Sequence, residues 1–258
     1  IPDSVTSIGE YAFYNCSSLE SITLPFVGAT KDETNNKHFG YIFGASSYSS
    51  NSSYVPTSLK TVVITGGDSI GSSAFQDCSS LTSIAFGENS QLTSIGSFAF
   101  YNCSSLTSIA FGENSQLTSI GRSAFYNCSS LEAVYITDIA AWCEILFSDY
   151  SSNPVCYAGA LYLDSELVTE LVIPDSVSSI ENYAFSGCSS LTNLMIPDSV
   201  TNIGDSAFED CSGLTGIAIP DSVTSIGSSA FSGCSGLTSI AIPNSVTSIG
   251  FRAFEDCN

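Results

Sequence analysis

The sequence predicts a curved solenoid in which short repeats stack strand upon strand. The first observation is a fixed internal period: "LTGIAIPDSVTSIGSSAFSGC" is followed near the carboxyl end by "LTSIAIPNSVTSIGFRAFEDC". The second is that each unit has its apolar residues on one side, so copies must stack, at about 4.8 Å, to bury them. The third is an apolar content of 43%, which is enough for a continuous core.

Cysteines recur with the period of the repeat. One group is spaced by 23 residues and another by 25: Cys188, Cys211, Cys234 and Cys257, and Cys78, Cys103 and Cys128. Cys16 has the same phase. The longer units differ in a turn, where "FGENSQLTSIG" replaces "IPDSVTSIG", and extra length in a surface loop costs little. Both versions therefore fit into one stack.

Each unit is expected to contain a strand, a turn and an inward-facing pair of residues. In "LTSIAIP", Ile240 and Ile242 have the period of two of a strand, and Pro243 ends it because proline cannot donate to a ladder. Gly250 permits a bend before "AF" places Phe254 inside. We expect the equivalent rings to be buried between neighbouring units: Phe13, Phe75, Phe100, Phe125, Phe185, Phe208 and Phe231.

The repeat resembles the BspA-like, 23-residue Treponema-type class of leucine-rich repeats, whose units read close to "LTSIxIPxSVTSIGxxAFxxCSS". Residues 1–24, 66–136 and 174–258 match this pattern almost letter for letter. The resemblance implies a horseshoe-like leucine-rich repeat solenoid, with parallel strands on the concave face and short strands, turns or helical turns on the convex face. It also implies an extracellular or cell-surface protein that binds other macromolecules.

We expect one solenoid over residues 1–258, interrupted by irregular insertions at 26–58 and 138–167. The chain starts and stops inside a repeat, so we interpret it as part of a longer protein. Two interpretations of the insertions stay open. Insertions in repeat arrays often carry binding specificity, but "HFGYIFG" echoes "SIGSSAF" and "LVTELVIP" echoes "LTSIAIP", which is typical of degenerate units that continue the stack.

The charge balance excludes two classes of partner. Five Lys and Arg against 25 Asp and Glu give a net charge of −20, which repels phosphate backbones and anionic lipids. No apolar stretch approaches the roughly 20 residues that span a bilayer. We therefore expect neither nucleic acid binding nor membrane insertion of this segment, and a protein, matrix or host-surface partner, or a glycan.

The in-phase cysteines are expected to be free, buried thiols. Stacked units hold their Cβ atoms about 5 Å apart, whereas a disulfide needs about 3.8 Å. Cys143 and Cys156 lie outside this ladder, 13 positions apart. A disulfide between them and burial of Cys143 against the stack both stay open.

Residues with catalytic chemistry are few. His38, the one histidine, lies in "NNKHFG" without a nucleophile at a recognisable spacing, so we expect a solvated loop side chain. Asp175, Asp198 and Asp221 are expected to cap turns, because "IPDSV" lacks the many oxygen ligands that calcium needs. We expect no enzyme activity, no metal site and no cofactor.

The outward strand positions decide what binds. Regular units present Thr, Ser and Ala, which are poor binding anchors, whereas the middle of the chain brings larger groups to this face or near it. We predict a site at Tyr135, Trp142, Met195, Glu132 and Glu170, where the acidic groups favour a basic or neutral partner.

A carbohydrate-binding repeat array is the alternative function. Flat, hydroxyl-rich strands and aromatic faces suit sugars, and the platform would consist of Tyr135, Trp142, Tyr150 and Tyr157.

Overall fold

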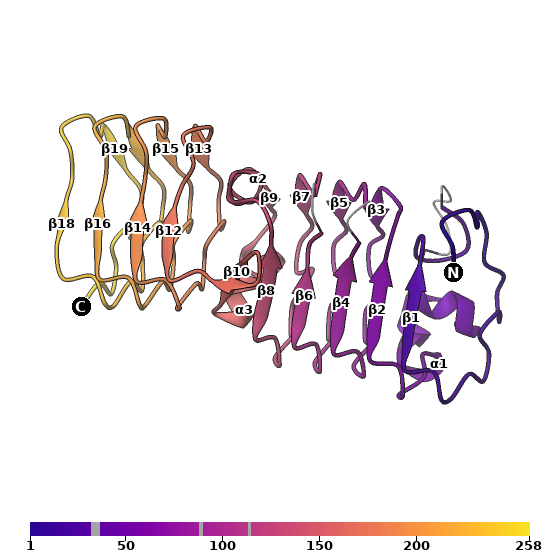
Figure 1. Cartoon of the computed structure of the whole chain (residues 1–258). Helices are drawn as coiled ribbons and strands as arrows, with labels where there is room; N and C mark the ends of the chain where they lie inside the picture. Colours follow the sequence, from indigo (N-terminus) through magenta and orange to yellow (C-terminus); the bar gives the residue numbers. More distant parts are fainter. Residues whose placement is uncertain (32–36, 88–89, 113–114) are drawn as a thin grey trace. The chain divides into compact units, whose positions relative to one another are not determined.

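The computed structural model describes residues 1–31, 37–87, 90–112 and 115–258 (Figure 1). The chain divides into two compact units, Ile1–Glu132 (unit 1) and Ala133–Asn258 (unit 2). Each unit is a parallel β-solenoid with little helix.

Unit 1 contains two columns of parallel, hydrogen-bonded strands. The first column consists of β1 (Ser21–Leu24), β2 (Thr61–Ile64), β4 (Ser83–Phe86) and β6 (Ser108–Ala110). The second consists of β3 (Ser69–Ile70), β5 (Ser94–Ile95) and β7 (Ser119–Ile120). Side chains alternate between two faces along each strand, so Ile84 is buried whereas Ser83 is partly exposed.

Unit 2 repeats this arrangement with shorter strands. One parallel column consists of β12 (Glu170–Val172), β14 (Asn193–Met195), β16 (Gly216–Ala218) and β18 (Ile240–Ala241). The other consists of β13 (Ser179–Ile180), β15 (Asn202–Ile203), β17 (Ser225–Ile226) and β19 (Ser248–Ile249). Earlier in the unit, β10 (Leu161–Leu163) pairs in parallel with β8 (Ala133–Ile136) and antiparallel with β11 (Glu166–Leu167).

The "AF" segments form a third column, which we call the turn column. Ser73 and Asp77 have positive φ angles of 56° and 61°, and the N–H groups of residues 73, 75 and 77 all donate to the following repeat. The Phe75 N–H donates to the Ala99 carbonyl at 2.7 Å, and the Phe208 N–H in unit 2 donates to the Ala230 carbonyl at 2.8 Å. Backbone hydrogen bonds therefore join neighbouring repeats on all three sides.

Phenylalanine rings stack inside the turn column of each unit. Ring centroids of Phe75 and Phe100 lie 5.2 Å apart, and those of Phe185 and Phe208 lie 5.4 Å apart with nearly parallel planes. The prediction of buried rings is confirmed for six positions, which are all fully buried: Phe75, Phe100, Phe125, Phe185, Phe208 and Phe231. Phe13 and Phe254 are only partly buried.

The cysteines are free thiols, and several of those in the ladder donate a hydrogen bond to a phenylalanine carbonyl group of a preceding repeat. The Cys211 Sγ lies 3.3 Å from the Phe185 carbonyl of the preceding repeat, and the Cys128 Sγ lies 3.2 Å from that of Phe100. Burial raises the pKa of Cys128 to about 12, so its thiol stays neutral. The repeat thus favours cysteine as a small side chain that also satisfies a carbonyl group.

The segment 26–58 holds η1 (Phe39–Phe43), η2 (Tyr48–Ser50) and α1 (Asn51–Tyr54). Phe39 extends the ring column, since its centroid is 4.8 Å from that of Phe75. The expectation of a solvated His38 is wrong: η1 packs against the repeat, the imidazole is buried, and its Nε2 lies 2.8 Å from the Ala45 carbonyl oxygen.

The segment 138–167 holds α2 (Ile139–Cys143), β9 (Leu146–Phe147), η3 (Tyr150–Ser152) and α3 (Val155–Ala158), followed by β10. Asn153 is fully buried, and its Nδ2 donates to the Tyr183 carbonyl at 2.7 Å. Asn51 has an equivalent place in unit 1, and both asparagines end a "YSSN" sequence. In both segments, a buried asparagine therefore holds a short helix against the turn column through hydrogen bonds to backbone carbonyl groups.

Candidate binding surfaces

The regular part of the strand face offers few groups for a partner. The Thr107 Oγ1 donates to the Thr82 carbonyl at 2.9 Å, and the Thr215 Oγ1 donates to the Thr192 carbonyl at 3.2 Å. These hydroxyl groups bind the preceding repeat. The threonines thus stabilise the stack, and the remaining outward side chains on this face are mostly small.

Large side chains replace the small ones on the strand face of unit 2. Tyr135 and Tyr162 are in register on β8 and β10, with ring centroids 4.9 Å apart, and Leu167 on β11 is in register with Tyr162. Val172 and Met195 are in register on β12 and β14 and are 54% and 53% exposed. We call these five residues the sheet-face patch.

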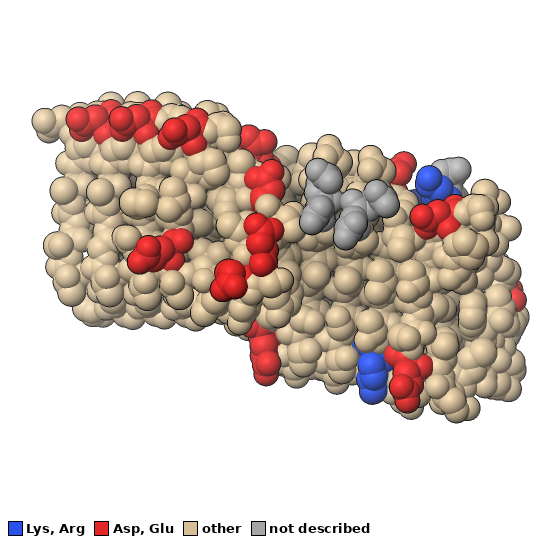
Figure 2. All heavy atoms as spheres, viewed as in Figure 1, with Lys and Arg blue, Asp and Glu red and all other residues tan. Residues whose placement is uncertain are grey.

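Acidic side chains flank the sheet-face patch. Glu170 and Glu166 are exposed on β12 and β11, and exposed Asp175, Asp198 and Asp221 follow in the turns after the strands. Figure 2 shows a row of red side chains along one edge of this strand face and further red side chains on the face itself. Glu132, another predicted site residue, is exposed and belongs to unit 1.

Contrary to our expectation, Trp142 does not lie on the surface. The ring is 2% exposed, and its Nε1 donates to the Ala184 carbonyl at 2.7 Å. It packs against Phe147, with ring centroids 5.4 Å apart. Trp142 therefore anchors α2 to the turn column, and the predicted platform of Tyr135, Trp142, Tyr150 and Tyr157 lacks its largest ring.

The two cysteines outside the ladder are separate thiols. Cys143 is fully buried, and the Cys156 Sγ donates to the Ser186 carbonyl at 3.3 Å. Of the two open alternatives for this pair, the structure has the buried Cys143. Tyr150, nearby in unit 2, has its pKa raised by burial, and by the Cys156 thiol and the Asp210 carboxylate.

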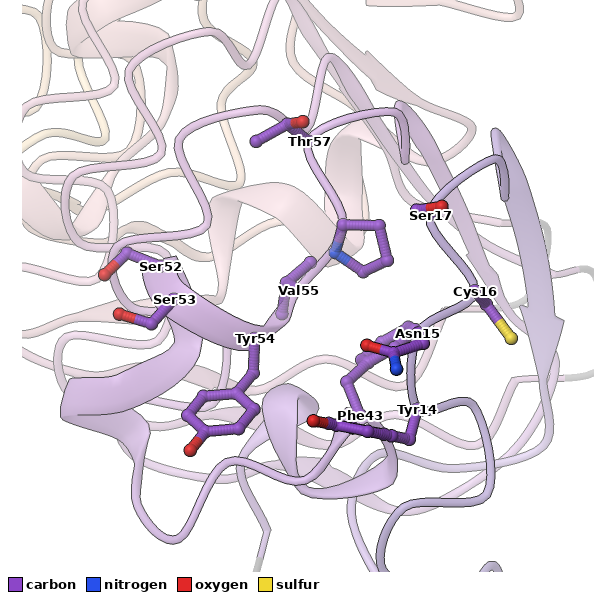
Figure 3. Close-up of a pocket in the computed structure, with 11 residues that line it drawn as sticks. Tyr14, Asn15, Cys16, Ser17, Phe43, Ser52, Ser53, Tyr54, Val55 and Thr57 are labelled. Carbon is purple, nitrogen blue, oxygen red and sulfur yellow. The ribbon is translucent and has the colours of Figure 1, made fainter.

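A pocket of about 360 Å³ lies beside α1 in unit 1 (Figure 3). Tyr14 and Tyr54 lie on two sides of it and are 53% and 42% exposed. Phe43 and Val55 are buried and form its floor. Its polar rim consists of Asn15, Ser17, Ser52, Ser53 and Thr57. We call it the tyrosine pocket.

The buried amide of Asn51 positions the tyrosine pocket. Its Oδ1 accepts from the Gly40 N–H at 3.0 Å, and its Nδ2 donates to the carbonyls of Ala74 and Gln76 at 3.2 and 3.0 Å. These bonds hold α1, and with it Ser52 and Tyr54, against the turn column. Sequence reasoning missed this pocket, although the repeated "YSSN" was a usable signal.

A second hollow of about 340 Å³ shares Ser52 with the tyrosine pocket. It contains a row of side chains from successive repeats: the Asn127 Nδ2 donates to the Asn102 Oδ1 at 3.0 Å, and the Asn102 Nδ2 donates to the Asp77 Oδ1 at 2.8 Å. We call it the asparagine hollow.

Among the described residues, no three His, Cys, Asp or Glu side chains gather in a way that could hold a metal ion. In the same ranges, none of the helices has the length and apolar character needed to cross a bilayer.

The family profile of the BspA type leucine rich repeat region matches residues 1–39, 47–152 and 159–258, in six copies. The chain belongs to the BspA-type leucine-rich repeat family. The two gaps in the match, 40–46 and 153–158, fall within the segments that carry the buried Asn51 and Asn153. The repeats of this BspA-type chain are therefore typical of the family, and only the short stretches 40–46 and 153–158 fall outside the match.

Several solved bacterial structures are similar to this BspA-type chain. A leucine-rich repeat protein from Bacteroides ovatus is 24% identical with a TM-score of 0.46, over 100% of this chain and 75% of that one. A leucine rich cell surface protein from Faecalibacterium prausnitzii is 23% identical with a TM-score of 0.46, over 95% and 83%. The pneumococcal vaccine antigen PcpA is 20% identical with a TM-score of 0.49, over 92% and 70%. No curated protein matches the chain in sequence.

Proposed function

We propose that this BspA-type chain is a non-enzymatic binding and adhesion module of a secreted or cell-surface protein. In this proposal it contacts a protein of the extracellular matrix or host surface through the sheet-face patch of unit 2. Family membership supports the general part, because repeat solenoids present extended surfaces to partners. The surface location is supported by the similarity to a protein described as a cell surface protein.

The observation that carries the proposal is the exposure of Val172 and Met195, in the same unit as a tyrosine pair. In register with them, the regular strands present Ala218 and Ala241. Met and Val in place of alanine put apolar area in water, which contributes nothing to the buried core. Exposed apolar patches with a polar rim are typical of interaction sites.

The acidic rim specifies the charge of the partner. Glu166 and Glu170 flank the patch, and the whole chain has a net charge of −20. A basic partner is attracted at long range, and salt screens this attraction. We therefore expect association to slow as the ionic strength rises.

A binding assay on immobilised matrix and host-surface proteins tests the proposal. The double variant Tyr135→Ala, Met195→Ala should weaken binding by roughly ten-fold or more, because two large contacts are lost. Thr238→Ala, two residues before β18 in a regular repeat of the same unit, is the matched control and should bind normally. Unchanged binding by the double variant, or capture of none of the proteins, contradicts the proposal.

A further inference from the structure

We propose that the tyrosine pocket of unit 1 binds a sugar ring of a neutral oligosaccharide. This site is separate from the sheet-face patch and goes beyond the proposed function. The inference uses the hydrogen-bonding character, the aromatic rings and the rigidity of the pocket.

The polar side chains of the pocket match hydroxyl groups. Serine, threonine, tyrosine and asparagine side chains both donate and accept hydrogen bonds, as sugar hydroxyl groups do. Among the described residues that line the pocket, none carries a charge. A phosphate or carboxylate ligand would require Lys or Arg, and a cationic ligand would require Asp or Glu. The rim therefore favours an uncharged, hydroxyl-rich ligand.

The protein itself does not use these polar side chains for its own hydrogen bonds. Within the described ranges, the side chains of Ser52, Ser53, Asn15 and Thr57 have no hydrogen-bond partner in the protein. By contrast, the neighbouring Ser58 Oγ donates to the Leu19 carbonyl at 2.8 Å. The hydroxyl groups of the rim thus do not stabilise the stack, and they are free to bind a ligand.

The two tyrosines supply the apolar contact that a sugar needs. One face of a pyranose carries C–H groups, which pack on the electron-rich face of an aromatic ring. Tyr14 and Tyr54 are both about half exposed and lie on two sides of the pocket (Figure 3). A volume of about 360 Å³ lies near the lower end of the range for small-molecule sites, as a single sugar ring with its hydroxyl groups requires.

The pocket is rigid before any ligand arrives. Phe43 is 1% exposed, and its ring packs against those of Phe13 and Phe39 with centroid distances of 6.1 and 5.4 Å. Asn51 fixes the backbone of α1 through three hydrogen bonds. Binding therefore requires little additional ordering of the protein, which favours affinity for a small ligand.

The asparagine hollow extends the site along the turn column. Because it shares Ser52 with the tyrosine pocket, a second sugar ring would lie next to the first. Its amide and carboxylate groups, from Asp77, Asn102 and Asn127, suit sugar hydroxyl groups. Oligosaccharides should therefore bind more tightly than monosaccharides.

A glycan array tests the inference, with neutral, sialylated and sulfated oligosaccharides as probes. The full chain should retain neutral glycans. For a retained glycan, Tyr14→Ala with Tyr54→Ala should weaken binding by roughly ten-fold or more. Tyr126→Ala removes an exposed tyrosine of unit 1 outside both hollows and is the matched control. It should bind within about two-fold of the parent.

Three outcomes would overturn the inference: retention of no neutral glycan, retention of anionic glycans alone, and equal binding by the double variant. Capture of matrix proteins without any glycan binding also overturns it. The variants of the sheet-face patch should leave glycan binding unchanged, so that the two proposals fail independently. Circular dichroism of each variant establishes that a loss of binding is not a loss of folding.

Discussion

Replacing Phe208 with alanine tests whether the stacked rings stabilise unit 2. The Phe208 ring is fully buried, and its centroid lies 5.4 Å from that of Phe185 and 5.3 Å from that of Phe231. Substitution of a buried Phe by Ala typically costs about 3–5 kcal/mol through lost burial and the cavity left behind. Collapse of the cavity is restricted, because backbone hydrogen bonds from residues 185 and 208 to the following repeats fix the spacing. We therefore expect the free energy of unfolding to fall by an amount near the upper end of this range, about 4–5 kcal/mol.

The assay is urea unfolding followed by tryptophan fluorescence. Trp142 is the single tryptophan of the chain and is buried in unit 2, so its emission reports the unfolding of that unit. Phe251→Ala is the matched control, because this ring is 72% exposed, and it should cost less than about 1 kcal/mol. A cost below about 1 kcal/mol for Phe208→Ala, or equal costs for both variants, would refute the reasoning.

Three further predictions concern the thiols, the docking asparagine and the patch. The free energy of unfolding should fall as the pH rises above 9.0, the ordinary thiol pKa, because unfolded thiols ionise whereas buried ones such as Cys128, with a pKa of about 12, stay neutral. Urea titrations between pH 7 and pH 11 measure this, and a constant free energy contradicts it. Asn51→Ala should cost about 2–3 kcal/mol and weaken glycan binding, since two buried backbone groups and one partly buried one lose their partner; calorimetry tests the first effect, and a change below about 0.5 kcal/mol would show that the amide is dispensable. Glu170→Gln should reduce the salt dependence of the association rate with a matrix protein, and an unchanged dependence argues against electrostatic steering by the patch.

The repeating elements were predictable because each is determined within one unit. The alternation in "SIA", the proline after the strand and the phase of Phe208 depend on residues a few positions apart, and the repetition confirms each of them several times. The burial of His38 and Trp142 was not predictable in this way. The Trp142 Nε1 is satisfied by the carbonyl of Ala184, 42 residues away, and no local pattern reports such a partner.

The tyrosine pocket illustrates the same limit. Tyr14 belongs to a regular repeat, whereas Tyr54 belongs to α1, and the docking of Asn51 brings the two together. Composition and periodicity show that both segments contain tyrosine, but they do not show that the two side chains lie close together. The sheet-face patch was easier to predict from the sequence. Tyr135 and Met195 occupy strand positions that can be identified by aligning the repeats.

The turn column has a polarity that the strand columns lack. In unit 2 the N–H groups of Phe208, Phe231 and Gly233 all donate toward the next repeat, so their peptide dipoles are aligned along the stack. As in an α-helix, aligned dipoles add to a macrodipole whose positive pole lies at the end with free N–H groups. Two such ends cannot satisfy each other because both present donors, so repeats of this kind extend only head to tail.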